Sequence, residues 1–324
     1  MTLTVSEITE LRIYPIKSCR GVKVSSIKST LQGLYLDRRW MFVDAENKFL
    51  TIRQQSKMTL INTKIDEEKQ QLVITIGDDK EKQIAVPLFP DHEYLEKHTK
   101  PATVNIWGSD TKAYMYTDPK IQALFRDFIG DGKEVNLVTK DPRDPRICAG
   151  NGSPEVLGRQ ATVNFPDVLP VLIASEASLA ELNGRLKAQG EEEITIERFR
   201  PNVIIKGGEA WSEDSWKTVR INGSSAPLSN WMPSMVSGMT GAVDMDVVAR
   251  CARCQVPNVN PDTADKNKHQ PWDTLMKYRR IDEGIKFKPC FGMLCVPRNE
   301  AEIEVGMRFE VLATTEDHHY MKGF

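Results

Sequence analysis

The sequence predicts a mainly β protein with some helices (α+β), divided into two parts. Most apolar residues occur in short segments that alternate with polar residues, which is the period of a half-buried strand. Only three stretches combine the helical period with capping signals. At 324 residues, the chain is also long enough to favour two domains over one.

The first part is predicted to consist of short strands broken by Gly, Asp and Lys turns. These strands are Glu10–Ile16, Val22–Ile27, Trp40–Val43, Leu72–Ile76, Ala102–Trp107 and Lys112–Tyr116. A helix follows, with Asp118 as its N-cap, Pro119 at its first position and Gly130 after its end. The next stretch, 140–146, is polar and contains two prolines, so we place the domain boundary there.

The second part is also predicted to be mainly β. Its helices are signalled by Ser175 or Ser178 as a cap with Gly190 at the end, and by a short pattern around Trp272–Tyr278. The segment Asn222–Gly241 is rich in Ser, Gly, Pro and Met, and we expect a long mobile loop that is either a lid or a tolerated insertion. The predicted strands are Asn202–Lys206, Trp216–Ile221, Met245–Arg250, Met293–Val296 and Glu302–Leu312.

The composition argues against several classes of function. With 43 basic and 45 acidic residues the net charge is −2, so we expect no nucleic-acid or membrane-surface partner. The N-terminus lacks the features of a signal or transit peptide. The longest apolar stretch, Val168–Ala174, is far shorter than the ~20 residues of a transmembrane helix. Six cysteines are too few for a dense disulfide framework, which indicates a reducing compartment.

The dipeptide Arg253-Cys254 is the strongest candidate for chemistry. A cysteine thiolate ligates metals, a neighbouring cation favours the thiolate form, and sulfur selects soft metals. A structural zinc site is one alternative, because Cys251 and Cys254 form one pair and Cys290 and Cys295 form another. The second pair has a poor spacing for zinc, and Cys295 lies in an apolar run. An inert buried cysteine is the other alternative.

Three basic residues lie at the ends of apolar segments, next to turns, where their side chains could point into a cleft. They are Lys17, Arg38 and Arg200. Arginine binds phosphate through two hydrogen bonds, and Lys17 with Ser18 and the nearby Gly21 could add an ammonium group, a hydroxyl and backbone N–H donors. Taken singly, each residue is better explained as a solvated surface cation.

Taken together, these segments resemble the MOSC family, whose domain binds the molybdenum cofactor, and most closely its amidoxime-reducing component subfamily. Seven strings occur in the order of the family and span nearly the whole chain. They are Ile13–Cys19, Leu36–Trp40, Ser175–Leu179, Phe199–Asn202, Glu213–Trp216, Arg253-Cys254, and Asn260–Thr263 followed by Leu275-x2-Tyr278-Arg279.

The resemblance implies an N-terminal β domain, residues 1–140, and a MOSC-type β-barrel, residues 148–316, with the first strands also able to pack with the barrel. It implies a molybdenum-molybdopterin cofactor between the two parts, with Cys254 as the metal ligand and the catalytic residue. It assigns no such role to Cys251. The residues that match the cofactor-holding positions are Lys17, Ser18 and Arg38 in the first part and Arg200, Arg253 and Cys254 in the second.

The sequence departs from the family pattern at two places beside these positions. Val168 and Leu169 stand after Asp167, where the family often has a Thr-Ser pair, and Ala252 replaces the Ser expected before Arg253. We therefore expect a cofactor pocket that is less polar on that side, and a substrate range that differs from that of the relatives. We also expect the Asn222–Gly241 loop to shape the substrate entrance.

The resemblance implies a reductase of N-oxygenated compounds such as amidoximes. Because the sequence has neither a dinucleotide fingerprint nor a ferredoxin-type cysteine array, electrons must come from elsewhere. The implied donors are a cytochrome b5-type haem protein and its NADH-dependent reductase. Asp214 or Asp262 could relay a proton, but we favour their interpretation as solvated loop carboxylates and assign the role to neither.

A different class of function remains open from the sequence. The alternative is a molybdenum cofactor carrier or a sulfurase-type maturation module, in which Cys254 would hold the cofactor or a sulfur atom transiently. Membrane-anchored relatives carry an N-terminal segment that this sequence does not show. We therefore expect a cytoplasmic location, and the mitochondrial outer membrane only if an N-terminal anchor was removed.

Overall fold

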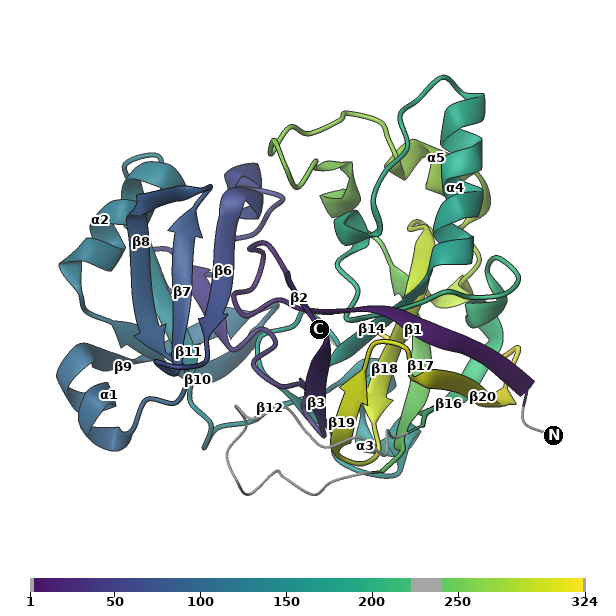
Figure 1. Ribbon diagram of the computed structural model, residues 1–324, viewed down its shortest axis with the longest axis horizontal. Helices are drawn as coiled ribbons and strands as arrows, with labels where there is room; N and C mark the ends of the chain where they lie inside the picture. Colours follow the sequence, from purple (N-terminus) through teal and green to yellow (C-terminus); the bar gives the residue numbers. More distant parts are fainter. Residues whose placement is uncertain (1–2, 223–240, 323–324) are drawn as a thin grey trace.

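The structure is a computed structural model that describes residues 3–222 and 241–322. It is mainly β, with 39% strand and 21% helix, as the sequence predicts. Figure 1 shows two lobes, one formed by the first part of the chain and the other by a barrel with helices at one end. No helix within the described residues combines the length and the apolar character needed to cross a bilayer.

In the described part of the chain, seven strands form a closed barrel. The strand order is β15-β14-β18-β17-β16-β20-β1, and β1 also pairs with β15, which closes the ring. β14 and β15 are parallel, and the other barrel pairings are antiparallel. The strands are β1 (Leu3–Ile13), β14 (Val171–Ser175), β15 (Val203–Ile205), β16 (Trp216–Ile221), β17 (Val243–Ala252), β18 (Cys290–Pro297) and β20 (Arg308–Thr314).

The first lobe holds two antiparallel sheets that lie beside the barrel (Figure 1). The four-stranded sheet has the order β5 (Trp40–Val43), β11 (Asn136–Lys140), β10 (Ser109–Tyr116) and β9 (Thr99–Ile106). The other is a meander of β6 (Ile61–Asp66), β7 (Gln71–Ile76) and β8 (Asp79–Pro87). The helices of this lobe are α1 (His92–His98) and α2 (Pro119–Phe128).

Helix α2 begins as its sequence predicts. The Asp118 side chain accepts a hydrogen bond from the Lys120 N–H, which satisfies one of the free donors at the helix start. Ile121 and Phe125 are its buried residues, and the ring of Phe125 lies 4.4 Å from that of Phe42 on β5. This contact fixes the helix to the four-stranded sheet.

Several short strands lie outside the barrel ring and outside the two sheets of the first lobe. β2 (Val22–Val24) extends the barrel sheet from β1, and β3 (Ser26–Thr30) pairs with both β4 (Gly33–Leu34) and β19 (Ala301–Glu304). The residues between the lobes form the pair β12 (Arg146–Ile147) and β13 (Thr162–Val163) and the short helix α3 (Pro154–Leu157). The three-stranded sheet of β19, β3 and β4 combines strands from both ends of the sequence.

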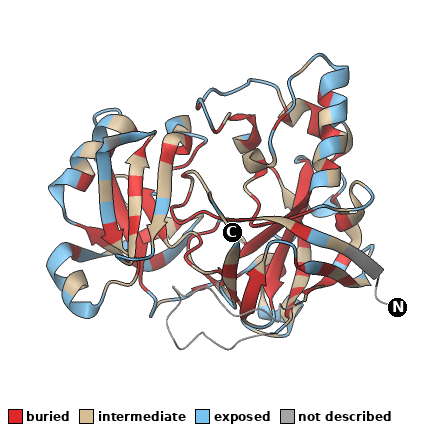
Figure 2. Ribbon diagram, in the orientation of Figure 1, coloured by how far each residue is buried: buried red, intermediate tan, exposed pale blue. Residues whose placement is uncertain are grey.

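Two helices pack at one end of the barrel. They are α4 (Glu176–Ala188), which begins at Ser175, and α5 (Trp272–Tyr278). Their buried leucines share an apolar cluster with Phe199 and Phe291, whose rings stack with centroids 3.7 Å apart. Figure 2 shows that burial is concentrated on the strands, whereas the outer faces of these helices are exposed.

The strand predictions need three corrections. Glu302–Leu312 is not one strand, because a turn at Gly306, with φ of 88°, separates β19 from β20. Val22–Ile27 is divided between β2 and β3, and Glu10–Ile16 is instead β1, which starts at Leu3 and ends at Ile13 where the chain turns toward the other lobe. The predicted bounds of β5, β16 and α5 are confirmed.

Two other predictions stay untested. Residues 223–240 of the predicted Asn222–Gly241 loop lie outside the described residues. The domain limits 1–140 and 148–316 also remain a prediction, and the barrel takes β1 from the first of these ranges.

Candidate cofactor site

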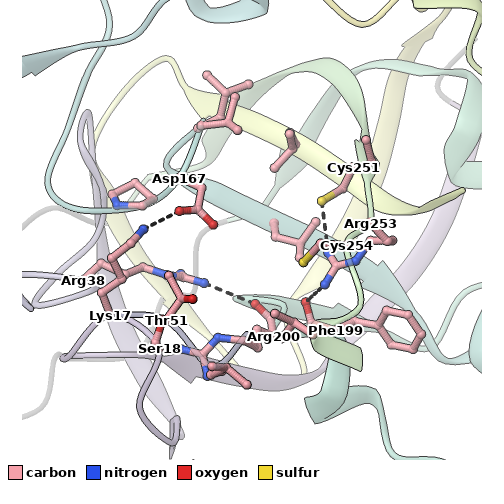
Figure 3. Close-up of a pocket in the computed structure, with 18 of the residues that line it drawn as sticks. Lys17, Ser18, Arg38, Thr51, Asp167, Phe199, Arg200, Cys251, Arg253 and Cys254 are labelled. Carbon is pink, nitrogen blue, oxygen red and sulfur yellow. Dashed lines mark hydrogen bonds and ion pairs between the residues drawn. The ribbon is translucent and has the colours of Figure 1, made fainter. Parts of the chain in front are cut away.

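One cavity between the two lobes is lined by all six residues predicted to bind a cofactor. Lys17, Ser18 and Arg38 reach it from the first part of the chain. Arg200, Arg253 and Cys254 reach it from the second part (Figure 3). The structure therefore places all six on one cavity, while the roles of the six residues stay predictions.

Three of the six residues have a left-handed backbone, which side chains other than glycine rarely adopt. The φ angles are 66° at Ser18, 46° at Arg38 and 58° at Arg200. Arg200 ends a short 3-10 helix, η3 (Ile196–Phe199), and precedes Pro201. Such strained residues persist where the surrounding structure holds them, and they concentrate at ligand-binding sites.

Lys17 is buried and paired with Asp167 at the edge of the cavity. Its Nζ lies 2.5 Å from Asp167 Oδ1 and donates to the Phe165 carbonyl at 2.8 Å. Burial lowers the pKa of Lys17 to about 8, although Asp167 opposes this shift. Burial alone would raise the pKa of Asp167, but Lys17 and a hydrogen bond from Trp107 Nε1 at 2.9 Å keep it well below its usual range.

Arg38 and Arg200 lie on the same aromatic ring. Their guanidinium carbons are 4.6 and 4.2 Å from the ring centroid of the fully buried Tyr14. Arg38 donates to Asn202 Oδ1 at 3.0 Å, and Arg200 donates to the Cys19 carbonyl at 2.6 Å. Burial lowers the pKa of Arg200, and the nearby charge of Arg38 lowers it further. The buried Asp37 carboxylate, 2.5 Å from Arg38 Nη1, balances one of these two positive charges, and the other favours a further anion.

Arg253 is held rigidly beside the two cysteines. Its Nη2 donates to the Phe199 carbonyl at 2.8 Å, and its Nη1 lies 3.0 Å from Cys251 Sγ. β17 ends at Ala252, so Arg253 and Cys254 follow directly where the chain leaves the barrel. Cys251 and Cys254 are both partly exposed and line the cavity (Figure 3).

The donor set fits a bound phosphate-bearing cofactor. Arg200 Nη2 and Arg253 Nε are buried and have no hydrogen-bond partner among the described residues. A buried donor without a partner costs about 1–3 kcal/mol, and an acceptor bound in the cavity would remove that cost. A partly exposed cysteine beside these donors adds a sulfur ligand for a soft metal. The chemistry of the site therefore suits a molybdenum cofactor.

Comparison with known proteins agrees with this chemistry. The pattern of the MOSC N-terminal beta barrel domain matches residues 5–132, and that of the MOSC domain matches residues 160–310. The chain belongs to the MOSC family. It is 28% identical over 318 residues to the human protein named mitochondrial amidoxime-reducing component 1, covering 93% of this chain and 82% of that protein.

A second relative has a similar name, whereas a solved structure gives only a weak match. The bovine mitochondrial amidoxime reducing component 2 is 28% identical over 316 residues, with the same coverage of 93% and 82%. A solved structure, the YUAD protein from Bacillus subtilis, is 10% identical and covers 96% of this chain and 95% of its own. Its TM-score of 0.35 is too low to support an argument.

The zinc interpretation of the four cysteines has no support in this MOSC fold. Cys290 and Cys295 are fully buried on β18, and burial raises the pKa of Cys290 to about 12. Within residues 3–222 and 241–322, no group of three or more Cys, His, Asp or Glu side chains could hold a metal ion. Cys251 and Cys254 are the cysteines that face the cavity.

The cavity has two walls of opposite character. We call Lys17, Ser18, Arg38, Arg200 and Arg253 the cation wall. The apolar wall consists of Val168, Leu169, Leu172, Leu294 and Tyr320. Val168 and Leu169 line the cavity as the departure from the MOSC pattern predicts. The expected loss of polarity is incomplete, because Tyr320 brings a hydroxyl to this wall.

Several residues of the site were not predicted from the sequence. Asn202 lies within a string that resembles the family, so it could have been found, whereas nothing in the sequence singles out Thr51, Arg53 or Tyr320. Asp214 and Asp262, considered as proton relays, do not line the cavity. Asp214 is paired with Arg279 at 2.8 Å, and Asp262 with Arg20 at 2.5 Å.

Proposed function

We propose that this protein is a molybdenum-cofactor-dependent reductase of N-oxygenated compounds such as amidoximes. The observation that carries the proposal is the cavity in which Cys254 meets the cation wall and two buried donors without partners. Membership of the MOSC family and the names of the relatives support the same chemistry.

Different residues of the cavity would bind different parts of the cofactor. The Cys254 thiolate would ligate molybdenum, and Lys17, Ser18, Arg38 and Arg200 would bind the anionic part of the molybdopterin. When bound, the cofactor supplies the two-electron reduction that removes oxygen from nitrogen. Arg253, fixed by the Phe199 carbonyl and Cys251, would stabilise negative charge next to the metal ligand.

Electrons would reach the site from separate proteins. We propose a cytochrome b5-type haem protein and its NADH-dependent reductase as donors, because the chain has no motif for a nicotinamide or an iron–sulfur cluster. The relatives are named as mitochondrial, and a cytoplasmic location for this protein stays a prediction.

The test is metal and pterin analysis of the purified protein beside Cys254→Ser, with Cys251→Ser as the matched control. We expect molybdenum and pterin in the wild type and turnover of benzamidoxime with a supplied electron donor. Cys254→Ser should lower the metal content and turnover by at least about 100-fold, because the protein's sulfur ligand is lost. Cys251→Ser should keep the metal, since it changes only a contact of Arg253.

Two outcomes would contradict the proposal. Full activity in Cys254→Ser would refute the ligand assignment. A cofactor that leaves the wild type on dilution, with no turnover under reducing conditions, would instead indicate the cofactor carrier or sulfurase-type maturation module.

A further inference from the structure

The chain continues past β20 as a C-terminal tail, residues 315–322, that returns to the cavity. Side chains from three separate segments bind its backbone. Arg250 and Asn151 donate to two successive carbonyls of the tail at 2.8 and 2.9 Å, and Asp282 Oδ1 accepts the Tyr320 N–H at 2.8 Å. All three anchoring residues are buried, so the tail is a built part of the fold.

The tail also packs against the backbone of a neighbouring turn. A Cβ atom added at Gly284 would lie 2.1 Å from the Tyr320 carbonyl oxygen, which leaves room for glycine alone. The backbone of Tyr320 is therefore fixed on both sides.

The Tyr320 side chain lies on the apolar wall. It is 8% exposed and packs in one cluster with Leu169, Leu172 and Leu294, which line the cavity with it. Burial raises the pKa of its phenol to about 12, and the nearby Cys251 adds to this shift. The hydroxyl therefore keeps its proton, and it donates no hydrogen bond to any of the described residues.

The Tyr320 hydroxyl and the donors of the cation wall suit different ligands. A neutral donor on an aliphatic surface favours a neutral acceptor, whereas guanidinium and ammonium groups favour phosphate. The match to the MOSC domain ends at residue 310, before the tail begins. Tyr320 thus adds a polar group to the wall from which Val168 and Leu169 removed hydroxyls.

We propose that Tyr320 is a substrate-binding residue whose hydroxyl donates a hydrogen bond to the oxygen of the N–O group, while its ring shapes the wall that contacts the rest of the substrate. This inference rests on the proposed function and extends it by naming the substrate contact. It predicts a preference for small, uncharged N-hydroxylated compounds over anionic ones, because the hydroxyl is a neutral donor and the other residues of the apolar wall are aliphatic.

The test compares Tyr320→Phe with His319→Ala, a change at the exposed neighbouring residue that leaves the tail backbone intact. Tyr320→Phe should raise KM for benzamidoxime and lower kcat/KM by about five- to tenfold, the size expected for one hydrogen bond. The inhibition constant of the product benzamidine should not change, because benzamidine lacks the oxygen. Molybdenum and pterin content and the unfolding temperature should match the wild type, and His319→Ala should change none of these values.

Each other result would overturn the inference. Unchanged kcat/KM in Tyr320→Phe would exclude the hydrogen bond, and an equal loss of benzamidine binding would show a packing role. Loss of pterin from Tyr320→Phe would place the hydroxyl on the cofactor rather than the substrate. A wild type without molybdenum or turnover would refute the proposed function first, and that failure is recognisable because it appears without any change at Tyr320.

Discussion

The cation wall and the apolar wall face the same cavity but are fixed by different forces. On the cation wall, Arg38, Arg200 and Arg253 are held by hydrogen bonds to carbonyl and amide oxygens and by stacking on aromatic rings. On the apolar wall, Leu172 and Leu294 are held by pairing of β14 with β18 and by packing. Charges that are fixed before the ligand arrives lose little freedom on binding. The comparison therefore predicts that cofactor binding depends on charge and pH, and that substrate choice depends on shape and one hydroxyl.

Removing one charge from the cation wall should have the largest effect. We expect Arg200→Gln to lower the molybdenum and pterin content of the purified protein by about 10- to 100-fold, because bonds to a charged donor are lost. Arg126→Gln is the matched control, since Arg126 is exposed on α2 and outside the cavity. Normal pterin content in Arg200→Gln would show that the cation wall does not hold the cofactor.

Raising the pH should weaken the cation wall and leave the apolar wall unaffected. The pKa of Lys17 is lowered to about 8, so its ammonium group is mostly charged at pH 7 and mostly neutral at pH 9. Because an anion prefers the charged form, cofactor retention during gel filtration should fall by up to about tenfold between these pH values. Lys17→Met should bind the cofactor weakly at both pH values. Equal retention by the wild type at pH 7 and pH 9 would contradict this role of Lys17.

A smaller effect is expected when the tail is displaced from the apolar wall. Gly284→Ala would force the Tyr320 backbone to shift, at a cost of about 1–3 kcal/mol in the free energy of unfolding. Urea denaturation should show this loss, and KM for benzamidoxime should rise while pterin content stays normal. Gly208→Ala is the control, because a Cβ atom there meets nothing within 4 Å. A loss of pterin in Gly284→Ala would mean that the two walls do not act separately.

The same contrast explains what could be predicted from the sequence. The cation wall was found because its residues lie in short strings, such as Phe199–Asn202, that resemble the family in sequence order. Tyr320 was missed because its place depends on Asn151, Arg250 and Asp282, which are distant in sequence and form no local pattern.

The fold shows a similar limit. Strands with alternating patterns, such as β7 and β16, could be predicted, whereas β11 could not. All five residues of β11 are buried, including Asn136 and Lys140, so no polar and apolar alternation marks the strand. Lys140 is accommodated because its Nζ donates to backbone carbonyls, including that of Lys112 on β10 at 3.3 Å. Hydrogen bonds that satisfy a buried charge in this way form only when distant segments fold together, so the local sequence does not indicate them.

The closure of the barrel by β1 has a consequence for synthesis in the cell. β1 spans residues 3–13 and its barrel neighbour β20 spans residues 308–314, so β1 cannot complete its pairing until β20 has been synthesised. Contacts between such distant residues require closure of a very long loop and slow the search for the native arrangement. The barrel therefore closes only after residue 314 has been synthesised, and a nascent chain that stalls before residue 308 leaves β1 without one of its two barrel neighbours.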